Sequence, residues 1–431
     1  MKTTKIVALL FFFGMVLGSC TSKSLQVTAA KDYDKYLNIK DNKSKDFAQN
    51  EINFWQNKYD IAPNQMSYLS LLASNYSKLF ENTGDVKNLY KAEELLLKSN
   101  EAYHYTSVGT MRSLARNYIS QHRFREALVL ANKAFAIGEG MKETQKLLFD
   151  VNMELGNYTE AEKNLKYLTD ATDFDYLIRI SKWNDHLGDL KTAITFMEKA
   201  SKIALDNDNK SLKIWTYSNL GDLNGHAGNI KTSYDYYLKT LAIEPNNSYA
   251  LKGIAWIAFS YEKNTKEATR IIDIISKRHH TPDFYLLKAQ IAEYENNIHL
   301  KNENLKAYFN MLNTINYGAM YNKYNTLIYA DDKTTAAKAL EIAKVEIDHR
   351  PTPDSYDLLA WSYYNLGDAK KALAIEQEYV IGKSFEPKLN YHVATIYKAN
   401  NLESKVAPIK KELLESTFEL GPNLEQKIIR L

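Results

Sequence analysis

Apolar residues recur along this chain with the spacing of one face of an α-helix, and residues 353–372 show the pattern most clearly. Positions i, i+3, i+4 and i+7 of this segment are apolar, as expected for a helix that buries one side. These positions are Tyr356, Leu359, Ala360 and Tyr363. A turn at Gly367 follows, because glycine readily takes the left-handed conformation that ends many helices. The chain then restarts, so the segment predicts a hairpin of two helices.

A small residue, Ala372, stands early in the second helix of this hairpin, where it lets the two helix axes approach closely. Similar residues recur at intervals of about 34 residues, apart from one double interval around a degenerate copy at 282–317. The series is Ala92, Ala127, Ala161, Ala193, Ser233, Ala268, Ala337, Ala372 and Val406. A hairpin this small cannot bury its own apolar faces and has to stack on neighbours. The pattern therefore predicts a repeat array of about ten hairpins across residues 62–420.

The period, the turn glycines and the small residues together resemble the tetratricopeptide repeat (TPR). Residues 214–247 match that repeat most fully, through Tyr217, Leu220, Gly221, Gly228, Ser233, Tyr237 and Pro245. The resemblance implies an all-α, right-handed superhelical solenoid of about ten TPR-like hairpins. It also implies that the first helix of each hairpin forms a concave inner wall.

The first twenty residues have the pattern of a secretory signal. Lys2 and Lys5 precede an apolar run of about a dozen residues, which is shorter than the roughly 20 needed to span a bilayer. The run ends in Leu-Gly-Ser-Cys at residues 17–20, which resembles a bacterial lipobox. We therefore expect residues 1–19 to be a signal peptide and Cys20 to be lipidated. An ordinary cleaved signal with a chance cysteine is the alternative.

The composition of the remaining chain distinguishes several segments, and its net charge is small. Residues 20–45 are rich in Lys, Ser, Asp and Asn without an apolar period, which predicts a flexible tether. Residues 46–61 suggest a capping helix, and residues 421–431 a C-terminal tail, either a short solvating helix or disordered. Lys+Arg 55 against Asp+Glu 52 gives a net charge of only +3 with no basic block, so nucleic acid is not an expected partner.

The sequence carries no recognisable catalytic or metal-binding constellation. The histidine pair His279–His280 lies in a predicted loop and its side chains diverge, and Cys20 is the only cysteine. The peptide-carboxylate clamp of chaperone-adaptor TPR domains is also missing, since its places hold Lys146 with Asp150, or Lys252 with Trp256. We therefore expect neither enzymatic activity nor a cofactor.

Several aromatic residues map to the predicted inner wall, on the sides of the first helices that do not face the neighbouring helix. They are Trp215, Tyr249, Trp256, Phe259, Trp361 and Tyr364. Aromatic side chains in a concave patch are common anchors for a partner, so these residues are a candidate binding groove. The alternative is that they pack against the next hairpin.

The architecture and the signal together are similar to the TPR lipoproteins common in Bacteroidetes. That resemblance implies an outer-membrane lipoprotein, with the periplasmic face favoured because residues 21–24 lack an acidic run. We expect a scaffold that binds a protein or peptide of the cell envelope. The alternatives are a glycan-capturing lipoprotein of the starch-utilisation type and an outer-membrane assembly factor.

Overall fold

The computed structural model describes residues 26–431, which form 24 α-helices and one π-helical turn, η1, with no strand in this range. The helices are α1 (Ala30–Leu37), α2 (Lys43–Ile61), α3 (Ser67–Thr83), α4 (Lys87–Ala102), α5 (Val108–Ser120), α6 (Phe124–Ile137), α7 (Met141–Glu154), α8 (Tyr158–Tyr167), α9 (Phe174–His186), α10 (Leu190–Asp206), α11 (Lys210–His226), α12 (Ile230–Ile243), α13 (Ser248–Trp256), η1 (Ile257–Tyr261), α14 (Thr265–Ile275), α15 (Asp283–Tyr294), α16 (Ile298–Thr314), α17 (Asn322–Ala330), α18 (Ala336–His349), α19 (Pro353–Asn365), α20 (Ala369–Tyr379), α21 (Pro387–Ala399), α22 (Glu403–Glu415), α23 (Thr417–Leu420) and α24 (Pro422–Ile429).

Helices α3 to α22 pair in order as ten hairpins, which confirms the predicted all-α solenoid. Each hairpin packs on the next, and α16 meets α17 through the stacked rings of Phe309 and Tyr329. Burial of the small residues explains why the pairs fit closely, since Ala127, Ala161 and Ala193 are all fully buried. One position of the predicted series is wrong. Ala337 is exposed, whereas Ala336 and Ala339 on either side of it are buried, so the inward face of α18 was predicted in the wrong register.

The degenerate copy at 282–317 also forms a hairpin, α15–α16. Lys301 occupies the place of the small residue in α16, and its ammonium pairs with Glu293 of α15 at 3.2 Å. A charged side chain is tolerated here because its head group stays partly exposed and finds a carboxylate partner.

Residues 26–45 are not the flexible tether that we predicted. Helix α1 buries Tyr33, Tyr36 and Leu37 and packs against α12 and α14, far along the sequence. The backbone N–H groups of Val27 and Thr28 donate to the Glu262 carboxylate at 2.7 and 2.5 Å. The predicted signal peptide and Cys20 lie outside the described residues. Helix α2 covers the residues expected to form the capping helix and packs on α3.

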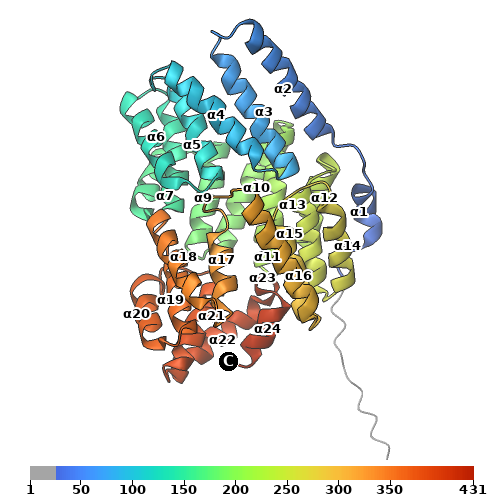
Figure 1. Cartoon of the computed structure of the whole chain (residues 1–431), viewed down its shortest axis with the longest axis vertical. Coiled ribbons are helices and arrows are strands. Elements are labelled where there is room, and N and C mark those ends of the chain that lie inside the picture. Colours follow the sequence, from blue (N-terminus) through green and yellow to red (C-terminus); the bar gives the residue numbers. More distant parts are fainter. Residues whose placement is uncertain (1–25) are drawn as a thin grey trace, which may run out of the picture.

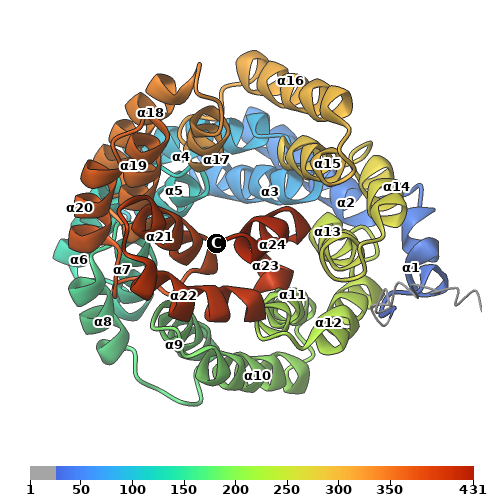
Figure 2. The same cartoon turned by 90° about the horizontal axis from the view of Figure 1, so that it is seen from below.

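The solenoid completes a turn, and the later hairpins lie against the earlier ones (Figure 1). The Tyr90 hydroxyl donates to the Asn316 carbonyl at 2.8 Å, and the Arg125 guanidinium donates to the Asp348 carbonyl at 2.5 Å. Seen from below, the helices form a ring in which α9, α11, α13 and α15 lie nearer the centre than α10, α12, α14 and α16 (Figure 2). We call the centre-facing surface of these first helices the inner wall.

The C-terminal residues lie inside this ring (Figure 2). Within residues 421–431, Pro422–Ile429 form helix α24, so the tail is a short helix, as one of the two alternatives predicted. It is not merely solvated, because Ile428 on that helix is fully buried. Helices α23 and α24 contact the last hairpin and also the inner wall at α11, η1 and α15. The end of the chain therefore connects the last hairpin to the middle of the inner wall.

Candidate functional site

Two cavities open on the inner wall on either side of α11. One, of about 430 Å³, lies among α11, α13, α15, α17 and α23, and we call it the Asp222 cavity. The other, of about 650 Å³, lies among α5, α7, α9 and α11, and we call it the Trp215 cavity. The same helix supplies residues to both cavities, so they are neighbouring parts of one concave surface.

Aromatic and ionisable side chains mix in the Asp222 cavity. The residues that line it are Asp222, His226, Tyr237, Tyr249, Lys252, Gly253, Trp256, Asp283, Leu286, Leu287, Gln290, Tyr324, Phe418 and Glu419. A surface of this kind offers rings for apolar contact and charges of both signs for orientation, which suits a polypeptide.

Two tyrosines fix the Asp222 carboxylate. The hydroxyls of Tyr237 and Tyr249 donate to its two oxygens at 2.6 and 2.5 Å. Burial raises the pKa of Asp222, although these hydrogen bonds favour the ionised form and oppose the rise. The Tyr237 ring lies between Gly221 and Gly253, where a Cβ atom would come within 2.5 and 2.4 Å of it. Both glycines are therefore required by the close approach of this ring.

Glu419, which lines the Asp222 cavity, interacts electrostatically with another buried acid, Glu386. Burial and the neighbouring carboxylates of Glu419 and Asp354 raise the pKa of Glu386 to about 7, against the opposing effect of Lys323. Burial also raises the pKa of Glu419 itself, while nearby His226 lowers it. Both carboxyl groups are therefore protonated more readily than an exposed glutamate.

The Trp215 cavity has the same mixed character. It is lined by Arg116, Ile119, Ser120, Leu147, Asp150, Glu154, Ile178, Arg179, Ser181, Lys182, Asp185, Met197, Trp215, Asn219 and Leu223. Trp215 is the aromatic side chain among them, and it is 42% exposed. Lys182 pairs with Glu154 at 2.8 Å across α9 and α7, so part of the charge is already balanced within the wall.

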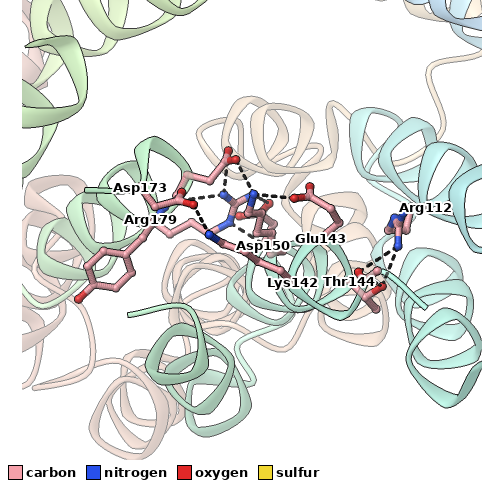
Figure 3. A network of polar contacts seen from close by, with 11 residues as sticks. Arg112, Lys142, Glu143, Thr144, Asp150, Asp173 and Arg179 are labelled. Atoms are coloured by element: carbon pink, nitrogen blue, oxygen red, sulfur yellow. Dashed lines mark hydrogen bonds and ion pairs between the residues drawn. The ribbon is translucent and has the colours of Figure 1, made fainter. Parts of the chain in front are cut away.

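An ion-pair network beside this cavity joins α7 to α9 (Figure 3). Arg179 donates to Asp150 at 2.6 Å, and Lys146, only 6% exposed, donates to Asp175 at 2.6 Å and to Glu143 at 2.7 Å. Burial lowers the pKa of Lys146, but these two hydrogen bonds more than offset it and leave the pKa above its usual value. Lys146 and Asp150, which stand where a carboxylate clamp would be, are thus occupied by contacts between hairpins.

The six aromatic residues of the predicted groove do not lie together. Trp215 lines one cavity, and Tyr249 and Trp256 line the other. Phe259 is 1% exposed and Trp361 7% exposed, so both belong to the packed core and neither is available to a partner. Trp361 stacks on His392 at 3.9 Å between ring centroids and on partly buried Tyr364 at 5.0 Å. The packing alternative therefore holds for these residues.

A buried polar cluster of Asp357, Glu376 and His392 lies next to Trp361, whose ring stacks on His392. The Asp357 carboxylate contacts His392 Nδ1 at 2.8 and 2.9 Å, and all three side chains of Asp357, His392 and Glu376 are buried. Burial and the nearby Asp357 carboxylate raise the pKa of Glu376 to about 10. The cluster lies away from both cavities, so it affects the stability of the last hairpins and not the inner wall.

Sequence reasoning missed the contribution of the C-terminus to the wall. Phe418 and Glu419 line the Asp222 cavity although they come from the last helices of the chain. Leu424 and Ile428, spaced i and i+4 after Pro422, are the signal that could have predicted a packed helix there.

Within residues 26–431, no group of three or more His, Cys, Asp or Glu side chains is placed to hold a metal ion. In the same range no helix combines the length and apolar character needed to cross a membrane.

No protein-family profile matches this chain, and no curated protein resembles it significantly. Solved structures of similar shape include pilF of Pseudomonas aeruginosa, at 15% identity over 49% of this chain and 92% of that one, with a TM-score of 0.36. A tetratricopeptide repeat protein from Parabacteroides merdae is 17% identical over 55% of this chain and 93% of its own, with a TM-score of 0.39. The human IFIT1 dimer with PPP-AAAA is 10% identical over 90% of this chain and 99% of its own, with a TM-score of 0.46. The likeness concerns helical-repeat architecture and carries no information about a partner.

Proposed function

We propose that this chain is a lipid-anchored scaffold of the cell envelope that binds a segment of a protein partner on its inner wall and catalyses no reaction. The pair of adjoining cavities carries this proposal, because they place Trp215, Tyr249 and Trp256 on one concave surface beside charges of both signs. Partly exposed aromatic side chains in a concave setting are the usual anchors of a bound polypeptide.

The envelope location rests on the sequence of the first twenty residues. The lipobox-like residues 17–20 support acylation of Cys20, and the favoured site is the periplasmic face of the outer membrane. Removal of Lys2 and Lys5 with the signal peptide lowers the net charge from +3 to +1, so attraction to anionic lipid would be weak. Acyl groups would then have to supply the membrane attachment.

A matched pair of variants tests the binding surface. Trp215 and Phe135 are both 42% exposed, but Trp215 lines the inner wall, whereas Phe135 on α6 lies in neither cavity. A photo-crosslinking residue at position 215, introduced in the native host, should capture a specific partner that the same residue at position 135 does not capture. Trp215→Ala should then weaken binding of that partner tenfold or more, which corresponds to about 1.4 kcal/mol, while Phe135→Ala leaves it unchanged. Equal effects of the two variants, or a loss that follows the melting temperature, would contradict a site on the inner wall.

A further inference from the structure

The last two helices bind the middle of the inner wall although they are about 160 residues away in sequence. We call residues 416–431, which contain α23 and α24, the C-terminal clasp. Helix α23 contacts α11 and η1, and α24 contacts η1 and α15 (Figure 2). The clasp therefore lies on the surface that carries the Asp222 cavity.

Phe418 is recognised through both its backbone and its ring. Its carbonyl oxygen accepts hydrogen bonds from Trp256 Nε1 at 3.1 Å and from Ser260 Oγ at 2.5 Å. Its ring packs on Gly225 of α11, where a Cβ atom would come within 2.8 Å of the ring. The side chain of Ser260 is only 1% exposed, so its hydroxyl is a buried polar group aimed at the clasp.

The wall changes from α-helix to π-helix at these contacts. The π-helical turn η1 spans Ile257–Tyr261 and contains Ser260, and Trp256 immediately precedes it. A π-helical turn is rare and is frequent at functional sites, because it gives up regular packing to redirect side chains. Here the irregular turn coincides with the two donors that hold the Phe418 carbonyl.

A second set of contacts holds the following helix. The Glu425 carboxylate pairs with Lys263 Nζ at 2.7 Å, and the Asn423 side-chain amide donates to the Gln290 carbonyl at 2.8 Å. Between the two sets, Gly421 joins α23 to α24 with φ of 78° and packs on the Trp256 ring, where a Cβ atom would come within 2.9 Å. The wall thus contacts an aromatic residue, a glycine turn and a carboxylate in that order.

These contacts are those of a bound peptide: one ring, one carbonyl with two donors, and one ion pair, around a glycine. We propose that the wall formed by α11, η1 and α15 is a peptide-binding site occupied in cis by residues 418–425, and that an external protein segment binds by displacing the clasp. The segment that fits carries an aromatic residue, a turn, and a carboxylate seven positions after the aromatic residue. This inference rests on the proposed function only in that the inner wall binds polypeptide.

Displacement is tested with the chain's own sequence as the probe, so no partner is needed. A fluorescent peptide of residues 414–431 is titrated into the purified full chain. Gly421→Ala should open the clasp, because the new methyl group meets Trp256 and the backbone has a positive φ. Gly382→Ala is the matched control, since Gly382 has a φ of 74° but nothing within 4 Å of its added Cβ.

We expect the peptide to bind the Gly421→Ala chain at least tenfold more tightly than the unaltered chain, and to bind the Gly382→Ala chain as weakly as the unaltered one. A second substitution, Lys263→Met, should abolish that gain. Hydrogen exchange should also show faster exchange across residues 417–425 in Gly421→Ala alone. If Gly421→Ala does not fold, Glu425→Gln removes the ion pair without backbone strain and should raise peptide affinity at least threefold.

A folded Gly421→Ala or Glu425→Gln chain that binds the peptide no better than the unaltered chain would overturn the proposal and leave the clasp as a permanent closure of the ring. That failure is distinct from a failure of the proposed function, which the Trp215 variants test with the partner itself. A partner lost with Trp215→Ala but unaffected by an excess of the peptide would refute displacement alone.

Discussion

The Tyr237 ring between two helical glycines provides a sharp test of how the inner wall is packed. In Gly253→Ala the new methyl carbon would lie 2.4 Å from the Tyr237 ring, far inside van der Waals contact. Either the ring stays and is overpacked, or it swings away and its hydroxyl leaves Asp222, to which it donates at 2.6 Å. Both responses reach the Asp222 cavity.

The magnitude follows from competing effects. Alanine in place of glycine within a helix favours folding by about 0.5–1 kcal/mol. Overpacking costs about 1–3 kcal/mol, and loss of a hydrogen bond to a charged group costs about 1.5–3 kcal/mol. Because the ring avoids one cost by accepting the other, Gly253→Ala should lower the free energy of unfolding by about 1–2 kcal/mol.

Urea unfolding, with Gly109→Ala as the control, measures this difference. Gly109 lies in α5 with nothing within 4 Å of an added Cβ, so its replacement should be neutral or slightly stabilising. In a double-mutant cycle, Tyr237→Ala should remove most of the cost of Gly253→Ala, because no ring then meets the methyl group. Equal stability of Gly253→Ala and Gly109→Ala, or an unchanged cost without the ring, would refute the reasoning.

Three further predictions concern the C-terminal hairpins and the anchor. The pKa of Glu376 is raised to about 10, above its ordinary value of 4.5, so the folded chain keeps a proton that the unfolded chain loses, and stability should fall as pH rises from 7 to 9. The fall is at most about 1.4 kcal/mol per pH unit, and urea titrations should find it absent in Glu376→Gln; an unchanged slope would contradict this account. Trp361→Ala should lower the free energy of unfolding by about 3–5 kcal/mol and the melting temperature by several degrees, because the ring is buried against His392. An unchanged melting temperature would contradict burial of this ring. Cys20→Ala should abolish metabolic palmitate labelling, and labelling that persists would argue against the lipobox.

The sequence by itself determined the repeat unit. Each hairpin is held by contacts between residues close in the chain, such as Ala360 with Ala372, so the period and the turn glycines were enough to predict ten hairpins. The sequence did not determine which face of helix α18 is buried. Ala336, Ala337 and Ala339 are chemically equivalent, and a step of one residue turns a helical side chain by about 100°.

The role of the aromatic residues depended on tertiary structure. Trp256 and Trp361 occupy equivalent places in their repeats, yet Trp256 lines the Asp222 cavity and Trp361 is buried against His392 of the following hairpin. Burial depends on which residues the neighbouring copy supplies, and those residues are not periodic. The sequence could name both tryptophans as candidates but could not separate a cavity-lining side chain from a core one.

Only the complete superhelix decided what lies beside each turn and inside the ring. Gly84, Gly156 and Gly188 end first helices as their sequence context predicts, but each also meets the next turn of the superhelix, at Thr281, Pro351 and Phe385 respectively. The contacts of α1 with α14 and of Phe418 with Trp256 are of the same long-range kind. A repeat pattern encodes the interaction of each hairpin with its neighbour, whereas contacts between residues about 160 to 240 apart depend on the curvature that all the intervening, irregular copies accumulate.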